Sequence, residues 1–248
     1  MKVLFIPANW SKKVEFSSEL INILKKISPI TIFTSVNFLD QLDEMVSVLK
    51  NEGIEVNVVK AKRTKSVGQI LGCDSYVDSF KAETSIEGNV LYVGDGNFHS
   101  NALLFSKIDS SSTIVTYDPK TKLSSILSSI DLKKNLLKIK SNLIKYTLSN
   151  SVGILVTSKS GQERLSDAIK LKSFLESKGK TAYLFLDDTF NFSKIEDFNF
   201  IDVWVNTACP RIVQDDAVNI IKPIINYVDA FDVSISLEKI EKTLKKFN

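Results

Sequence analysis

The sequence predicts an α/β protein made of two related Rossmann-like lobes, each a small parallel sheet flanked by helices. Two observations predict this fold. Short, continuously apolar runs rich in β-formers alternate with segments of helical periodicity, which is typical of parallel sheets covered on both faces. One such unit then recurs in the second half of the chain. The 248 residues, of which 44% are hydrophobic, provide enough chain and apolar surface for two cores.

The first lobe is predicted to span residues 1–128. Its predicted strands are Val3–Ile6, Ile30–Thr34, Ile54–Val59, Val90–Val93 and Thr113–Thr116. A helix is predicted over residues 38–50, where apolar side chains recur on one face, and Gly53 follows as its C-terminal cap. Residues 121–149 are rich in Leu, Ile, Lys and Ser and contain neither Gly nor Pro. They are therefore predicted to form one or two helices that link the halves.

The second lobe, residues 129–248, repeats the order of the first. Leu155-Val156-Thr157 echoes Ile32-Phe33-Thr34, and the helix that ends before Gly179 echoes the one that ends before Gly53. The strands predicted here are 153–157, 181–186 and 202–206, and the amphipathic spacing of residues 237–247 predicts a terminal helix. Each lobe carries one cysteine, and if the two repeats are related by a rough symmetry, these equivalent cysteines are expected to converge on a single site.

Composition excludes several classes of function. The net charge of +3 is small and the lysines are spread along the chain, so no direct contact with nucleic acid is expected. No uncharged apolar stretch reaches about 18 residues, so we expect a cytoplasmic protein without a membrane segment. Two cysteines and one histidine match no zinc-finger spacing, and a structural disulfide is not expected in a reducing compartment.

Two cysteine segments are the candidate metal ligands. In Leu71-Gly72-Cys73 the glycine leaves room for a bulky group beside the sulfur, although a small buried thiol is the alternative interpretation. In Ala208-Cys209-Pro210-Arg211 the cation favours a thiolate, and it could also offset cluster charge or bind a carboxylate. Asp215 and Asp216 follow and are expected to orient Arg211; a strand-end turn with an exposed ion pair is the alternative.

Two glycine-containing turns are the candidate cofactor-binding segments. Gly94-Asp95-Gly96-Asn97-Phe98-His99 follows a predicted strand but matches neither the phosphate-binding loop nor the dinucleotide fingerprint. Its glycines allow close approach of a ligand, and His99 could donate a hydrogen bond or act as acid or base. Gly161-Gln162 precedes a helix predicted to start near Glu163, where outward N–H groups suit an anion. A purely structural turn is the alternative for both.

These segments, with Tyr117-Asp118-Pro119 and Lys222-Pro223, occur in the order seen in the archaeal diphthamide-synthesis family 2-(3-amino-3-carboxypropyl)histidine synthase, which residues 20–235 resemble. The resemblance implies a 4Fe-4S cluster held by three cysteines, one per domain, with S-adenosylmethionine on the fourth iron. It implies transfer of a 3-amino-3-carboxypropyl radical to a histidine of translation elongation factor 2. Cys73 and Cys209 match the cysteines of the second and third family domains. The residues implied to lie near the cofactor are Gly94, Asp95, Gly96, His99, Gly161, Gln162 and Arg211.

The resemblance does not extend to the first family domain or its cysteine, apart from a remnant strand at Val3–Ile6. It therefore implies a partner chain that supplies the third cysteine, and a transferase that is active only in that complex. Three alternatives stay open. The chain could be an accessory protein without a cluster, a diverged paralogue that binds something else, or a nucleotide- or phosphate-binding enzyme that uses the Gly94–Gly96 loop.

Overall fold

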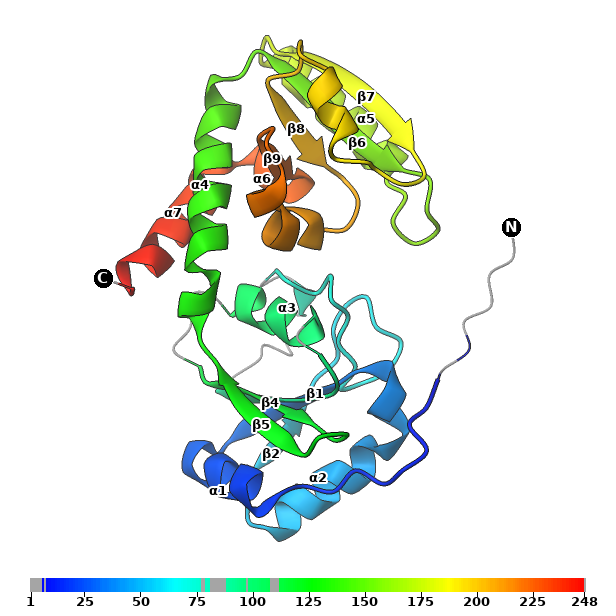
Figure 1. Cartoon of the computed structure of the whole chain (residues 1–248), viewed down its shortest axis with the longest axis vertical. Coiled ribbons are helices and arrows are strands. Elements are labelled where there is room, and N and C mark those ends of the chain that lie inside the picture. The colour runs from blue at the N-terminus through cyan, green and yellow to red at the C-terminus, as the bar shows by residue number, and fades with distance from the viewer. Residues whose placement is uncertain are drawn as a thin grey trace. The chain divides into compact units, whose positions relative to one another are not determined.

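The chain divides into two compact units, Met1–Ser129 and Ile130–Asn248 (Figure 1). The structure is a computed structural model that describes residues 6, 8–76, 79–80, 88–96, 98–107 and 112–247. Each unit combines a mainly parallel sheet with flanking helices, which confirms the predicted α/β class. The predicted remnant strand Val3–Ile6 lies outside the described residues, apart from Ile6 itself, which is not in a strand.

The described residues of the N-terminal unit form a five-stranded sheet with the order β2-β1-β3-β4-β5. The first four strands are parallel, and β5 runs antiparallel to β4. The strands are β1 (Ile30–Thr34), β2 (Val56–Val58), β3 (Asn89–Val93), β4 (Ile114–Asp118) and β5 (Leu123–Leu127). The helices are α1 (Ser18–Ile27), the 3-10 helix η1 (Val36–Gln41), α2 (Leu42–Asn51) and α3 (Phe98–Ser106).

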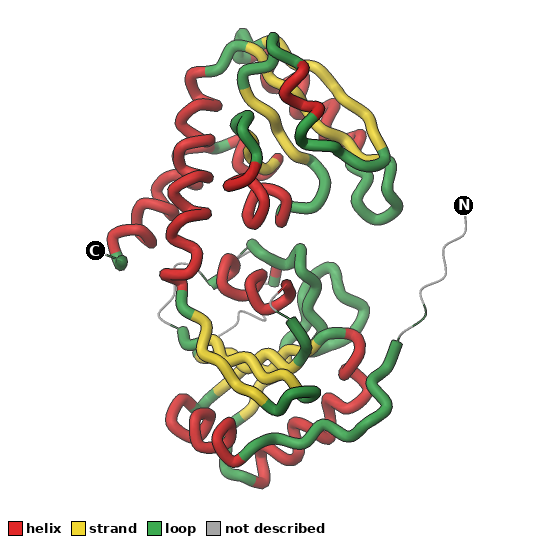
Figure 2. The backbone as a smooth tube through the Cα atoms, in the orientation of Figure 1, coloured by secondary structure: helices red, strands yellow, loops and turns green. Residues whose placement is uncertain are grey.

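Helices cover both faces of this sheet (Figure 2). The apolar sides of α1 and α2 pack against β1 and β3, in a core that includes Leu24, Leu49, Ile32 and Leu91. The opposite face carries α3, whose His99 ring stacks on Tyr92 of β3. Fully burying one such aliphatic side chain stabilises the fold by about 1.5–3 kcal/mol. The central strands are therefore buried on both sides, as their continuous apolar runs predict.

The described residues of the C-terminal unit form a four-stranded, all-parallel sheet with the order β7-β6-β8-β9. Its strands are β6 (Ser151–Thr157), β7 (Thr181–Asp187), β8 (Val203–Asn206) and β9 (Ile224–Asn226). Its α-helices are α4 (Lys133–Leu148), α5 (Leu165–Ser177), α6 (Tyr227–Phe231) and α7 (Val233–Lys245). Shorter helical turns are η4 (Ser129–Leu132), η5 (Lys194–Asp197), the π-turn η6 (Ile212–Asp216) and η7 (Ala217–Asn219). Helix α4 packs on β9, and α5 packs on β6 and β7.

Both sheets share one topology for their parallel strands. In each unit the order along the sheet is second, first, third and fourth strand in sequence. The glycines that were predicted to end matching helices both adopt left-handed backbone, with φ of 80° at Gly53 and 78° at Gly179. Both follow a helix and precede a strand, a position where only glycine lacks a steric penalty. The two units therefore repeat one design, as the echoed segments indicate.

The predicted helices over residues 121–149 are only partly correct. Helix α4 occupies the second part, but residues 123–127 form the antiparallel edge strand β5. A tight turn that places Lys122 in the left-handed region, with φ of 58°, returns the chain alongside β4. The 38–50 helix is likewise split, because residues 36–41 form η1 before α2 begins. Strand β9 and helix α1 were not predicted.

None of the helices in the described part of the chain is long and apolar enough to cross a membrane.

We expect Gly153→Ala to lower the free energy of unfolding by about 1–3 kcal/mol, because overpacking a filled core strains it. A Cβ at Gly153 in β6 would lie 2.5 Å from the ring of its register partner Trp204, which is fully buried. Chemical denaturation measures the change. Ser151→Ala, two residues earlier in the same strand, is the control and should shift stability by less than about 0.5 kcal/mol. Equal effects of the two substitutions would contradict this packing.

Candidate functional site

The Cys73 turn lies at the carboxyl edge of the N-terminal sheet. Beyond β2, the segment at Gly68–Ile70 pairs with the end of β1: Thr34 N–H donates to the Gly68 carbonyl (2.8 Å) and Ile70 N–H to the Thr34 carbonyl (3.2 Å). Gln69 thus forms a parallel bridge with Thr34, whose other neighbour is Val93 of β3. This arrangement brings Leu71-Gly72-Cys73 and the loop that follows β3 to the same sheet edge, where α/β proteins bind ligands.

Hydrogen bonds to its main chain hold the Cys73 turn. Asp74 is fully buried, and its Oδ2 accepts from the Leu71 N–H at 2.9 Å. Arg63 Nη1 donates to the Cys73 carbonyl at 3.2 Å. Burial raises the pKa of Asp74, and the Leu71 N–H and the Arg63 charge oppose that rise. Cys73 is half-buried and forms no disulfide.

Gly72 is required by its neighbour Phe98. A Cβ at this position would overlap the Phe98 ring, which extends from the first turn of α3. Phe98 is 52% exposed. The glycine predicted to make room beside Cys73 therefore admits an aromatic side chain of the same unit. The Cys73 turn and the start of α3 are packed together by this contact.

Neighbouring side chains leave the Gly94–His99 segment less room for a ligand than predicted. Gly94 is needed because the Tyr92 hydroxyl occupies the space its side chain would fill. Asp95 pairs with Lys120 at 2.6 Å, a hydrogen bond that lowers its pKa. Gly96 is exposed with φ of 66°. His99 lies inside α3 rather than in a loop, because helix formation starts at Phe98. Asn97 lies outside the described residues.

The Cys209 turn closes β8 in the C-terminal unit. Asn206, the last residue of β8, donates from Nδ2 to the Cys209 carbonyl at 2.8 Å. The Cys209 carbonyl also accepts from the Ile212 N–H (3.2 Å), so the turn leads directly into η6. The thiol is free of any disulfide and half-buried.

Arg211 is buried beside this turn, with 3% of its surface exposed. Its Nη2 donates to Asp215 Oδ2, so the predicted pairing with Asp215 is confirmed. Burial and the neighbouring Asp215 charge raise the pKa of Asp216, and Arg211 opposes that rise. The guanidinium is therefore placed by its own helical turn, next in sequence to Pro210 and Cys209, and supplies a permanent positive charge there.

The Gly161-Gln162 turn does not present the outward N–H groups that were predicted. The N–H groups of Gln162 and Glu163 both donate to the Lys159 carbonyl at 3.0 Å. Helix α5 begins at Leu165, whose N–H donates to Glu163 Oε1 at 2.6 Å. Gly161 and Gln162 themselves are exposed, and Gly161 has φ of 82°. Internal turn bonds therefore use donors that an anion would otherwise need.

The two cysteines do not occupy matching places in the repeat. Cys73 precedes the third strand of its sheet, whereas Cys209 follows the third strand of its own. The register makes Gly94 the topological counterpart of Cys209. Ile32 pairs with Leu91 and its counterpart Leu155 pairs with Asn206, and Gly94 and Cys209 each lie three residues beyond those partners. The idea of equivalent cysteines is thus wrong at the level of topology. Among the described residues, no group of three His, Cys, Asp or Glu side chains could hold a metal ion.

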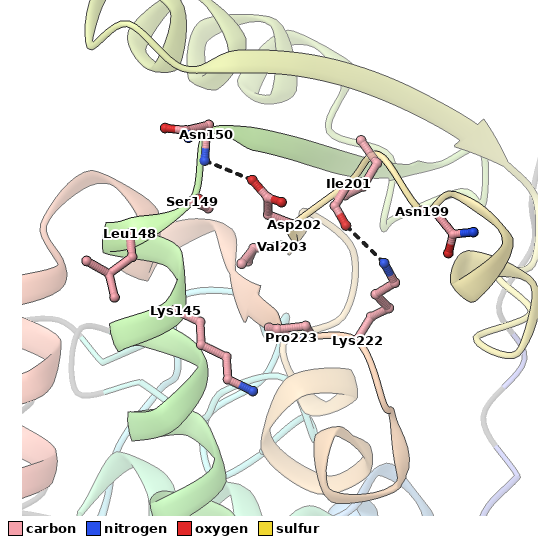
Figure 3. Close-up of a pocket in the computed structure, with 10 residues that line it drawn as sticks. All are labelled: Lys145, Leu148, Ser149, Asn150, Asn199, Ile201, Asp202, Val203, Lys222 and Pro223. Atoms are coloured by element: carbon pink, nitrogen blue, oxygen red, sulfur yellow. Dashed lines mark hydrogen bonds between the residues drawn. The ribbon is translucent and has the colours of Figure 1, made fainter.

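A separate open pocket of about 550 Å³ lies at the amino end of the C-terminal sheet (Figure 3). Asp202 accepts from the N–H groups of Ser151 and Asn150, each at 2.9 Å, which lowers its pKa. Lys222 donates to the Ile201 carbonyl at 3.1 Å. The pocket includes the Lys222-Pro223 pair but none of the predicted cofactor or metal residues. Its lining residues are Lys145, Leu148, Ser149, Asn150, Asn199, Ile201, Asp202, Val203, Lys222 and Pro223.

Comparison with known proteins identifies the family of this chain. Residues 1–245 match the family model described as putative diphthamide synthesis protein. The chain belongs to this family. It is 31% identical over 216 residues to the 2-(3-amino-3-carboxypropyl)histidine synthase of Pyrococcus horikoshii, which covers 86% of this chain and 60% of that protein. It is 29% identical over 178 residues to subunit 1 of the Dictyostelium discoideum synthase, which covers 69% of this chain and 36% of that subunit.

A solved structure supports the same family. The chain matches Dph2 from Pyrococcus horikoshii with a 4Fe-4S cluster at a TM-score of 0.70 and 27% sequence identity. The match covers 89% of this chain and 60% of that one. The family prediction is therefore confirmed, and its solved member carries the predicted type of cluster. The chain spans about 60% of the length of the archaeal relatives that it matches.

The two cysteine turns fit part of the ligand set of such a cluster. Cysteine thiolates are the usual protein ligands of 4Fe-4S clusters. Neither thiol is in a disulfide and both cysteines are half-buried, and each turn is held by hydrogen bonds to the cysteine carbonyl. Arg211 adds a buried cation next to one of them in sequence. Two sulfurs are fewer than a 4Fe-4S cluster requires, so further ligands have to come from elsewhere.

We expect Gly72→Ala to destabilise the chain through Phe98, with a coupling free energy of about 1 kcal/mol in a double-mutant cycle. The overlap between a Cβ at position 72 and the Phe98 ring disappears in Phe98→Ala. Gly72→Ala should then cost clearly less in the Phe98→Ala background than alone. Denaturant unfolding of the four variants measures this. The same cost in both backgrounds would refute the packing of the Cys73 turn against α3.

Proposed function

We propose that this chain is a subunit of a diphthamide-synthesis radical transferase. In this role it contributes to moving a 3-amino-3-carboxypropyl group from S-adenosylmethionine to a histidine of translation elongation factor 2. The observation that carries the proposal is the pair of cysteine turns. Both cysteines are half-buried and outside any disulfide, in a chain that is similar to a solved structure with a 4Fe-4S cluster. A purely structural relative would not need either thiol.

In the proposed enzyme, Cys73 and Cys209 each contribute one thiolate ligand. When bound, the cluster supplies the electron that breaks the bond between the sulfonium and the transferred group. Arg211, which is paired with Asp215, lies next to the Cys209 turn in sequence, where its charge would offset part of the negative charge of thiolate ligation. The proposed neighbours of the cofactor are Gly94, Asp95, Gly96, His99, Gly161 and Gln162. Of these, Gly96, Gly161 and Gln162 are exposed.

The proposal includes a protein partner that supplies the third cysteine. The sequence has two cysteines, and the described residues contain no group of three His, Cys, Asp or Glu side chains that could hold a metal ion. The relatives that it matches are longer than the region it covers. A second chain with one exposed cysteine would complete the ligand set. Translation elongation factor 2 is the proposed protein substrate of that complex.

Anaerobic reconstitution of the full chain with iron and sulfide tests the cysteine assignment. We expect iron uptake with absorbance near 400 nm, increased by the partner and lost in both Cys73→Ser and Cys209→Ser, because each removes a thiolate ligand. Thr207→Val is the matched control for Cys209→Ser. Thr207 is buried and lies two residues away, and its hydroxyl donates to the Leu155 carbonyl rather than to the turn. Uptake that survives both cysteine substitutions would contradict the assignment.

A transfer assay tests the reaction. The reconstituted complex, a chemical reductant that keeps the cluster reduced, S-adenosylmethionine labelled in its carboxyl group and translation elongation factor 2 should together give labelled protein, with release of 5′-methylthioadenosine. Label should be absent when the chain carries Cys209→Ser. A cluster-bearing complex that binds S-adenosylmethionine but never labels the factor would overturn the proposed substrate and leave the cluster assignment intact.

A further inference from the structure

Two buried asparagines end adjacent strands beneath the Cys209 turn. Asn206 closes β8 and Asn226 closes β9, and the two are direct register partners. Their side chains are 2% and 3% exposed. A buried amide costs stability unless its donors and acceptor are hydrogen-bonded. The hydrogen bonds that these two amides make therefore indicate which part of the chain they stabilise.

The amides hold three consecutive residues of the turn. Asn206 Nδ2 donates to the Cys209 carbonyl (2.8 Å) and to Asn226 Oδ1 (2.9 Å), while Asn206 Oδ1 accepts from the Ala208 N–H (3.1 Å). Asn226 Nδ2 donates to the Pro210 carbonyl at 3.0 Å. That carbonyl also accepts from the N–H groups of Val213 and Gln214, at the start of η6. The pair thus links the sheet, the cysteine turn and the turn that carries Arg211.

The other unit offers an internal comparison. Ile32 and Leu155 are equivalent in the repeat; Ile32 pairs with Leu91, and Leu155 pairs with Asn206. Leu91 in turn pairs with Val115, just as Asn206 pairs with Asn226. Leu91 and Val115 are both fully buried core residues. The same sheet position is thus apolar where the third strand leads to Gly94 and amide-lined where it leads to Cys209.

We propose that Asn206 and Asn226 are positioning residues for Cys209. By fixing the main chain on both sides of the cysteine, they set the direction in which its sulfur leaves the sheet edge. This inference rests on the proposed function, in which the Cys209 sulfur is a cluster ligand. Two neutral amides then determine the direction in which that ligand points. Neutral groups suit the task, because a carboxylate in either place would repel the carbonyls that the amides bind.

The test measures thiol reactivity without iron, in the full chain carrying Cys73→Ser so that Cys209 is its single thiol. Asn226→Ala removes the donor to Pro210 and the acceptor for Asn206. We expect iodoacetamide to alkylate Cys209 at least about fivefold faster, because fivefold is the factor that corresponds to one lost hydrogen bond and the substitution removes two. Asn142→Ala is the matched control: Asn142 is also fully buried and donates to the Ile224 carbonyl of β9 at 2.9 Å, away from the turn. The alkylation rates of the two variants are compared under conditions in which both have the same free energy of unfolding.

An Asn226→Ala rate within twofold of the control rate, or below it, would overturn the proposal. The Asn206→Ala, Asn226→Ala double variant should react no faster than the faster single variant, since the two amides act as a unit. Should the variants fail to fold, hydrogen exchange of the unaltered chain decides. The Ala208 N–H lies outside any strand, yet its hydrogen bond to Asn206 Oδ1 should protect it from exchange. Rapid exchange of this N–H would refute the proposed role of the two asparagines.

If Asn226→Ala did not speed the alkylation of Cys209, the proposed function would still stand, since Cys209 could bind iron without help from the amides. Conversely, faster alkylation in Asn226→Ala, combined with iron uptake that does not need Cys209, would keep the positioning role and overturn the proposed function.

Discussion

The parallel hydrogen-bonded ladder is the constraint on which the rest of each unit depends. Because parallel strands all point the same way, the turns that follow them gather at one edge of the sheet. In the N-terminal unit, pairing at Thr34 brings the Cys73 segment and the loop after β3 to that edge. In the C-terminal unit the same geometry aligns Asn206 with Asn226 under the Cys209 turn. The chemistry-bearing turns thus owe their placement to strand register.

The two cysteine turns are held by different means. The Cys73 turn is held by the buried carboxylate of Asp74, by Arg63, and by the Phe98 ring that packs against Gly72. At Cys209 two neutral amides do so, and the cation is paired within the following turn. Each solution leaves a half-buried thiol on a fixed main chain. Preorganised ligands lower the cost of binding a metal group, since less conformational freedom is lost when it binds.

Much of the fold could be predicted because its signals are local. Continuous apolar runs marked β1, β3 and β6, and the glycines after α2 and α5 marked the helix ends. Strand β5 escaped prediction because a run of Leu, Ser and Ile without Gly or Pro suits a helix as well as an edge strand. The Asn206–Asn226 pair escaped because asparagine ordinarily signals a turn, and only register brings the two together. For the same reason, the counterpart of Cys209 could not be identified without the sheet order.

We propose that Cys73 and Cys209 ligate one iron–sulfur cluster in the assembled enzyme. A crystal structure of the anaerobically reconstituted complex, with anomalous data collected at the iron edge, would test this. We expect a single iron cluster within bonding distance of both Sγ atoms, with a third sulfur from the partner chain. Iron bound to only one of the two cysteines, or bound away from both, would contradict it.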